Sequence, residues 1–421
     1  MNGASFLQFA LVVLLVLFAI SIRFSERLRG YQFTAWIVAI VALAMSYPNN
    51  VLHFAGLDLR NKWAMLIAIQ TVMFGMGVHM SLKDFAGVAK SPRGVIVGIL
   101  CHFTIMPLVG LTLIKLFAFP PEIAAGVILI GSCSSGLASN VMAYIAKSNL
   151  ALSVTVTAVT TMIAPVMTPL WMKWLAGELV PVDYFNMMTE IVKIVLVPIG
   201  AAMIHDYLKT ASPAGKNLVM TVAEFAAAWL VLLPLGSWDF CKNYFSENGM
   251  TALTLGGFLL SAFVIGVLYH TLWQRCPWLD RLMPTLAIAG ILYVTAMAIA
   301  AGRDNLMQVG GLLFLACALH NTAGYFLGYL LSRAAGLDKN SARSIAFEVG
   351  LQNGGMASGL AAAMGKLGTV GLAAAMFIPW MNISGSILAN YWGKRPVKAC
   401  EPQIATPDDS AAPQRSAAEQ G

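Results

Sequence analysis

The sequence predicts an all-α, polytopic membrane protein, and three observations lead to this fold class. Of the 421 residues, 58% are hydrophobic and only 11% are charged, which is about half the charged fraction of a soluble domain. The hydrophobic residues form runs of about 20, the length that crosses the hydrocarbon core of a bilayer. Lys and Arg concentrate in alternate loops between these runs, as they do in multi-pass membrane proteins. This composition excludes a water-soluble globular domain.

Thirteen segments are long and apolar enough to be predicted as membrane spans. The first is followed, not preceded, by arginines, so we expect residues 1–30 to contain a retained extra helix and not a cleavable signal peptide. The spans are predicted near residues 5–24, 33–54, 62–81, 93–117, 122–146, 150–176, 187–208, 217–237, 251–272, 283–301, 306–333, 342–365 and 368–393. Residues 397–421 are rich in Ala, Pro, Ser and charge, and we expect a disordered cytoplasmic tail there.

The distribution of basic residues predicts the orientation of the chain. Eighteen of the 26 Lys and Arg lie in alternate loops, starting after the first segment, and in the C-terminal tail. The positive-inside rule therefore places the N-terminus outside and the C-terminus in the cytoplasm. The net charge of +7 is explained by topology, and the sequence has no basic patch interleaved with aromatic residues that would indicate nucleic acid. The six cysteines have no CxxC or metal-ligand spacing.

Two of the predicted spans contain residues that a membrane helix normally avoids. The fifth contains GSCSSGLASN, residues 131–140, and the twelfth contains FEVGLQNGGMASG, residues 347–359. Backbone that leaves the helix at membrane depth needs partners in the protein or in a water-filled cavity. An ionised group such as Glu348 costs about 3 kcal/mol there. We therefore predict two discontinuous helices with a compensating partner for Glu348.

A bound cation would compensate the charge of Glu348. Alkali cations prefer oxygen ligands from carboxylates, amides, hydroxyls and free carbonyls, and both broken segments contain these groups. Ser153 and Thr157 are four residues apart, share a helix face and add two hydroxyls. Small residues in membrane helices also serve helix packing, which explains GSCSSGLASN equally well when that segment is taken alone.

The two broken segments resemble each other. SGLASN at 135–140 and GGMASG at 354–359 share a pattern of small residues around Ala-Ser, and each broken span precedes a span that contains proline. This arrangement is typical of transporters built from two inverted repeats with the binding site at their interface. We expect a five-plus-five core with additional helices.

Three stretches resemble signatures of the bile acid:sodium symporter family and occur in the family's order: MFGMGVHMSLKDF at 73–85, residues 131–170 and FEVGLQNGGMASGLA at 347–361. The similarity runs from about residue 33 to residue 393. The resemblance implies a ten-helix core in which two discontinuous helices cross and hold two sodium ions. It also implies sodium-coupled transport of organic anions, which are bile acids in animals and smaller carboxylates such as pantoate or pyruvate in bacterial and plastid relatives.

The resemblance also implies site residues. The first sodium site would be Ser139, Asn140, Ser153, Thr157 and Glu348, and the second would be Glu348, Gln352 and the carbonyls of Val349 and Leu351. Substrate would contact Asn353 and, in the last span, Asn382, close to Ala138 and Leu137 in the cavity wall.

The sequence departs from the family in three respects. His102 stands where bacterial relatives often have a glutamine that completes the second sodium site, and a neutral imidazole is a poor sodium ligand that can carry a proton. We therefore expect one sodium ion, or one sodium and one proton, unless His102 only fills a helix interface. Leu137 replaces a threonine, which suggests a changed substrate. Finally, the symporter domain at 31–396 is expected to contain an inserted helical hairpin at about 213–278.

These observations predict a secondary active transporter in the cell (inner) membrane. It would couple sodium to a small organic anion, either bile-acid-like or a monocarboxylate such as pantoate, by alternating access. Two alternatives stay open: a sodium-independent or proton-coupled exporter or channel, and a non-transporting membrane sensor. An enzyme is not expected, because the sequence has no Ser/His or paired-Asp arrangement and no HExxH.

Overall fold

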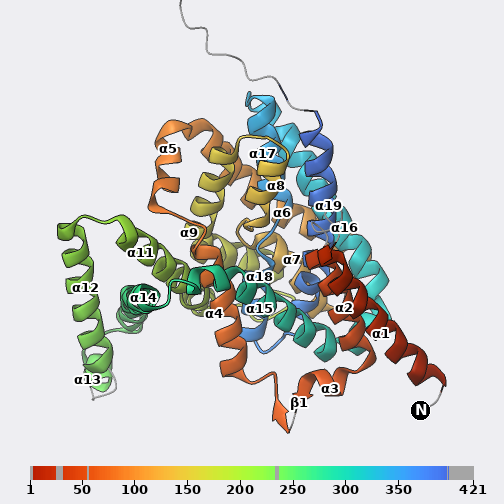
Figure 1. Ribbon diagram of the computed structural model, residues 1–421, viewed down its shortest axis with the longest axis horizontal. Coiled ribbons are helices and arrows are strands. Elements are labelled where there is room, and N and C mark those ends of the chain that lie inside the picture. Colours follow the sequence, from red (N-terminus) through yellow and green to blue (C-terminus); the bar gives the residue numbers. More distant parts are fainter. Residues whose placement is uncertain (1–2, 25–31, 55, 233–236, 396, 398–421) are drawn as a thin grey trace, which may run out of the picture.

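The computed structural model describes residues 3–24, 32–54, 56–232, 237–395 and 397, and these residues are almost entirely helical (Figure 1). A single two-residue hairpin is the only sheet among them; it pairs β1 (His53–Phe54) with β2 (Leu57–Asp58). The predicted all-α fold is therefore confirmed for the described chain. The predicted tail at 397–421 lies outside the described residues except for Val397.

The helices before residue 213 are α1 (Gly3–Ser21), η1 (Ile22–Phe24), α2 (Gln32–Ser46), α3 (Pro48–Leu52), α4 (Lys62–Gly77), η3 (Leu82–Ala86), α5 (Gly87–Lys90), α6 (Pro92–Phe117), α7 (Pro121–Ser132), α8 (Ala138–Ile145), α9 (Leu150–Ala176), α10 (Tyr184–Ile191), η4 (Val192–Leu196) and α11 (Val197–Thr210). The remaining helices are α12 (Pro213–Leu232), α13 (Ser237–Tyr244), α14 (Glu247–Arg275), α15 (Leu279–Ala301), α16 (Arg303–Ala334), α17 (Lys339–Gly350), α18 (Gly354–Ala363) and α19 (Val370–Gly393).

Each of the thirteen predicted spans contains a helix or a series of helices in the described chain. Nine described helices are long and apolar enough to cross a membrane on their own, or ten if the bent pair Lys62–Gly77 and Leu82–Lys90 is taken as one span. The short helices of the fifth and twelfth spans fall below this length because the chain breaks inside them. The total of thirteen spans and the inverted repeat stay predictions.

The predicted hairpin contains α12, α13 and α14, which lie at one side of the molecule (Figure 1). α14 packs against α11 and α4 through Ala262, Ala201, Ala202 and Phe74. α12 packs on α14 and exposes apolar side chains such as Leu218 and Phe225, as expected for a surface that faces lipid. The assignment of residues 213–278 as an insertion stays a prediction.

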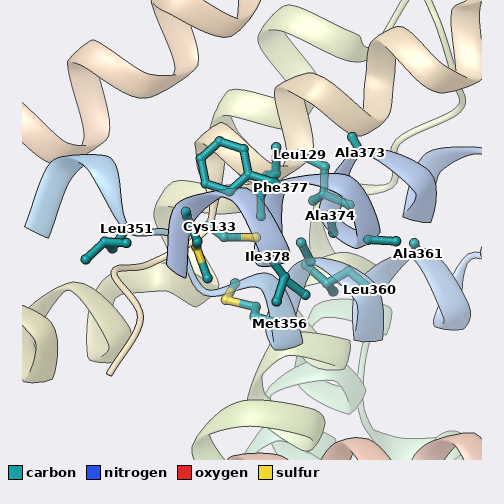
Figure 2. Packing of buried hydrophobic residues seen from close by; sticks show 14 of the residues in the cluster. Leu129, Cys133, Leu351, Met356, Leu360, Ala361, Ala373, Ala374, Phe377 and Ile378 are labelled. Atoms are coloured by element: carbon teal, nitrogen blue, oxygen red, sulfur yellow. The ribbon is translucent and has the colours of Figure 1, made fainter. Parts of the chain in front are cut away.

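The largest cluster of buried apolar side chains surrounds the two broken spans. Figure 2 shows Cys133 and Met356, one beside each break, packed against Phe377 and Ile378 of α19. α18 approaches α19 so closely that a Cβ on Gly354 would lie 2.2 Å from Cγ1 of Ile378. This packing fixes the two breaks next to each other at the centre of the molecule.

Candidate cation site at the crossing of two broken helices

The two broken spans exchange backbone hydrogen bonds where their helices stop. Ser135 and Gln352 form an antiparallel bridge, in which Gly136 N donates to Leu351 O at 3.0 Å and Asn353 N donates to Ser134 O at 2.8 Å. These bonds satisfy backbone groups that would otherwise be unpaired at membrane depth. The approach requires glycine, because a Cβ on Gly136 would lie 2.8 Å from the carbonyl oxygen of Gln352.

All five residues predicted for the first sodium site meet beside this crossing. Glu348 is fully buried on α17, and its two carboxylate oxygens accept hydrogen bonds from Ser153 Oγ at 2.5 Å and Thr157 Oγ1 at 2.8 Å. Asn140 Oδ1 lies 2.9 Å from Ser153 Oγ and 3.2 Å from Thr157 Oγ1. Ser139 Oγ lies 3.3 Å from Thr157 Oγ1. α8, α9 and α17 therefore bring the predicted ligands together.

Polar oxygen atoms surround the carboxylate of Glu348. The hydroxyls of Ser153 and Thr157 lie within hydrogen-bond distance of both its oxygens and of Oδ1 of Asn140. The hydroxyl of Ser139 donates to Gly136 O at 2.8 Å, an oxygen that also accepts from Ser139 N. Carboxylate, amide and hydroxyl oxygens are the ligands that a hard cation prefers.

The charge of Glu348 also lacks a cationic partner. None of the ion pairs within the described residues includes Glu348. A buried carboxylate is normally paired, protonated or bound to a metal ion. No group of three or more His, Cys, Asp or Glu that would suit a transition metal occurs in the described chain. The ligands here are hard oxygens, which suit sodium.

The residues predicted for the second sodium site lie at the end of α17 and in the break that follows it. Gln352 Nε2 donates to Val349 O at 2.7 Å, so the Val349 carbonyl already has a partner. Leu351 O accepts from Gly136 N. Gln352 Oε1 is buried and has no hydrogen-bond partner in the described structure. The amide oxygen is therefore the open ligand of this group.

His102 does not present a free nitrogen to this second group. Its Nδ1 lies 2.9 Å from Glu348 O and its Nε2 lies 2.8 Å from Cys133 O. The ring thus bridges the last turn of α7 to α17 and sits among backbone carbonyls, fully buried. The sequence placed His102 among the second-site ligands, but in this geometry the ring acts as a brace between the two broken helices.

The predicted substrate residues are dispersed. Leu137 and Ala138 are partly exposed at the start of α8. Asn353 is 2% exposed, and its side chain caps α18 by accepting from Met356 N at 3.0 Å. Asn382 donates to Ile378 O within its own helix at 2.8 Å. Asn353 donates its backbone N–H in the bridge at the crossing, and Leu137 directly follows Gly136 of the same bridge.

Sequence reasoning missed the polar residues of α16 that support the break. Asn321 Nδ2 donates to Gly350 O at 2.8 Å, and Ser384 Oγ donates to Asn321 Oδ1 at 2.6 Å. Gly350 is the last residue of α17, so its carbonyl has no helical partner and needs this bond. The signal was present as three adjacent polar residues, His320, Asn321 and Thr322, in the middle of a mostly apolar span.

Known proteins are similar to this chain in sequence and in fold. Residues 66–237 match the model of the sodium bile acid symporter family. The chain is 32% identical over 375 residues to the uncharacterized sodium-dependent transporter YocS of Bacillus subtilis, and the match covers 89% of this chain and 94% of that protein. The chain belongs to the sodium bile acid symporter family.

Other members of the sodium bile acid symporter family align less completely. The human ileal sodium/bile acid cotransporter is 30% identical over 311 residues, which cover 72% of this chain and 69% of that protein. The probable sodium/metabolite cotransporter BASS1, chloroplastic, of Arabidopsis thaliana is 28% identical over 336 residues, covering 80% of this chain and 68% of that protein.

The fold is also similar to that of a solved structure, the sodium proton antiporter MjNhaP1 from Methanocaldococcus jannaschii. The TM-score is 0.54 at 11% sequence identity, and the match covers 93% of this chain and 98% of the antiporter. The family predicted from the three motifs is confirmed. This member of the sodium bile acid symporter family is a multi-pass membrane transporter of a sodium-coupled family, and not an enzyme.

Proposed function

We propose that this chain is a symporter that carries sodium and a small organic anion together by alternating access. The anion would be bile-acid-like or a monocarboxylate such as pantoate. One observation carries the sodium part of the proposal: the fully buried carboxylate of Glu348 is surrounded by the oxygens of Asn140, Ser153 and Thr157 and forms no ion pair among the described residues. A sodium ion supplies the positive charge that this cluster lacks.

The position of the cluster explains how sodium would be coupled to the substrate. Its oxygens come from α8, α9 and α17, and two of these helices are halves of the broken spans. A bound ion would therefore hold the crossing in one arrangement. Coupling needs only that this arrangement bind the anion better than the empty one does.

We propose one sodium ion at this cluster. The second group offers the free oxygen of Gln352, but the carbonyls of Val349 and Leu351 already accept hydrogen bonds from Gln352 Nε2 and Gly136 N. A second sodium would have to compete with these donors. His102, which lies between the carbonyl oxygens of Cys133 and Glu348, would link the broken helices in place of a second ion.

The unpaired buried carboxylate also favours one alternative, a proton-coupled carrier. Protonation of Glu348 would remove the buried charge without a metal ion. Sodium and proton coupling differ in their measurable requirements, because uptake driven by a proton gradient continues when potassium replaces sodium.

The decisive experiment measures uptake into liposomes that contain the purified protein. Radiolabelled pantoate, pyruvate and taurocholate are each offered with an inward sodium gradient and with potassium in its place. We expect at least one of these anions to enter only with sodium. Uptake that is equal in both salts for every anion would reject sodium coupling.

The site itself is tested by Glu348→Gln and Asn140→Ala. Each removes an oxygen or the negative charge from the cluster, so we expect the concentration of sodium for half-maximal uptake to rise at least about tenfold. Glu224→Gln is the matched control, since Glu224 is an exposed carboxylate of α12 away from the crossing. Sodium dependence that is unchanged in both site variants would reject the assignment.

We further propose the cell (inner) membrane as the location, with no nucleic-acid partner.

A further inference from the structure

A second feature of the molecule is a cavity of about 460 Å³ between α4, η4 and α18. Its size is that of a pocket for a small molecule. The wall combines apolar side chains such as Met65, Leu66 and Ile194 with the cationic groups of Arg60, Lys62 and Lys193. A basic, partly apolar pocket suits an anion with an apolar body.

The cavity leads towards the crossing. Ile69 lines it and also lines a gap of about 10 Å³ that is bordered by Val72, Gly355 and Ser358. Such a volume holds about one water molecule, so the passage is closed to larger solutes. A Cβ on Gly355 would lie 3.6 Å from Oδ1 of Asn353, which places the inner end of the gap at the break in α18.

Lys193 is placed in this cavity by an irregular turn of helix. Residues Val192–Leu196 form a π-helix, in which Val197 N donates to Val192 O. In this register the carbonyl of Lys193 would face the nitrogen of Pro198, which has no hydrogen. Gln70 of α4 supplies the missing donor, with Nε2 at 3.3 Å from Lys193 O. π-helical turns are rare in proteins as a whole, and those that occur are often found at functional sites.

The ammonium group of Lys193 forms an ion pair with Glu190, which another carboxylate could replace. Its Nζ lies 2.6 Å from Glu190 Oε1, and the two side chains are 23% and 24% exposed. The same Nζ lies 6.0 Å from the ring of Phe258 on α14. A partly exposed ion pair between residues three apart contributes little to stability, and an incoming carboxylate can take the place of Glu190.

The other cations of the cavity have different surroundings. Arg60 forms two side-chain hydrogen bonds with Asp58, at 3.1 and 2.9 Å. These bonds hold the pKa of the Asp58 carboxyl down to about 2, so that Asp58 stays ionised at neutral pH and offsets Arg60. Lys62, an exposed residue at the start of α4, adds a long-range attraction at the rim.

We propose that Lys193 is the specificity-determining residue of an entrance subsite, where the carboxylate of a small organic anion replaces Glu190 as its partner. This inference rests on the proposed function and adds the residue that selects for negative charge. The subsite lies on the far side of the constriction from the cation cluster. The anion would bind there first and reach the crossing when Ile69 and Val72 separate.

The experiment titrates the purified protein with pantoate, pyruvate and taurocholate, and reads the affinity from thermal stabilisation at constant sodium. We expect Lys193→Gln to weaken the binding of at least one of these anions about tenfold, because a charge-assisted contact is lost. Lys193→Arg should restore most of the affinity. Glu190→Gln should strengthen binding about threefold, since the competing carboxylate is gone.

Lys115→Gln is the matched control. Lys115 is exposed in the last turn of α6 and does not line the cavity. Affinities of Lys193→Gln that equal those of this control would overturn the proposal, and so would the absence of anion stabilisation in the unaltered protein. A separate titration with sodium alone reports on the Glu348 cluster. Failure there, with an intact effect of Lys193, would reject the proposed sodium coupling and leave the subsite standing.

Discussion

His102 lies between two carbonyl oxygens, Cys133 O from one broken span and Glu348 O from the other. A neutral imidazole has one N–H, so it donates to either Cys133 O or Glu348 O, whereas the doubly protonated ring donates to both. The resemblance to the family implied that His102 stands where bacterial relatives often have a glutamine. It did not show that both nitrogens would meet main-chain oxygens, because that depends on how two distant breaks are superposed.

A first prediction concerns this residue. In His102→Gln an amide oxygen would take the place of the ring beside the carbonyl oxygens of Cys133 and Glu348, in addition to the unpaired Oε1 of Gln352. We expect the Hill coefficient of sodium-dependent uptake to rise from about one towards two, because an amide oxygen is the better sodium ligand. His79→Gln is the control, since His79 is exposed beyond the end of α4. A Hill coefficient and pH profile identical to those of the unaltered protein would show that His102 has no part in coupling.

At the scale of elements, the sequence predicted the breaks better than the contacts between them. GSCSSGLASN and the segment with Asn353 and Gly354 indicated the two helix breaks, because polar and glycine residues stand out inside apolar spans. The bridge between Ser135 and Gln352 joins residues more than 200 positions apart, and no local pattern encodes such a pairing. The bond from Asn321 to Gly350 O and the support that Gln70 gives to the π-helix before Pro198 were also missed, because the polar residues stand out in the sequence but their distant partners do not.

A second prediction addresses the closeness of the crossing. In Gly136→Ala the new Cβ would lie 2.8 Å from the carbonyl oxygen of Gln352, so the two breaks would have to move apart. Overpacking of this kind costs about 1–3 kcal/mol. We expect a lower unfolding temperature in detergent and a loss of sodium-driven uptake.

The control makes the same chemical change where space is available. Gly311 is exposed on α16, and a Cβ there would meet no atom within 4 Å. Alanine in mid-helix is better than glycine by about 0.5–1 kcal/mol, so Gly311→Ala should keep or raise the unfolding temperature. Equal effects of the two substitutions would mean that the crossing tolerates separation.

At the scale of the whole molecule, the predicted topology receives support from contacts between loops. Loops predicted in the cytoplasm meet at one end: Arg93 donates to Ala335 O at 2.6 Å and Arg343 to Arg395 O at 3.0 Å. Loops predicted outside meet at the other, where Lys366 pairs with Glu122 and Asn305 donates to Gly368 O at 3.2 Å. In Figure 1 α5 and α17 lie towards one end and β1 and α3 towards the opposite one. The alternation of basic loops thus separates the same two ends that the fold separates.

Which end faces the cytoplasm decides how the anion enters. The basic cavity with Arg60, Lys62 and Lys193 lies at the end predicted to be outside, so it would attract anions from the external medium. Replacing Lys62 or Lys339 with cysteine, one at a time, tests this assignment, because both lysines are exposed and they lie at opposite ends of the molecule. A membrane-impermeant maleimide should label Lys62→Cys in intact cells and Lys339→Cys only after permeabilisation. The chain without either substitution gives the background of the native cysteines. The reverse labelling pattern would show that the orientation in the membrane is inverted, and the cavity would then open to the cytoplasm.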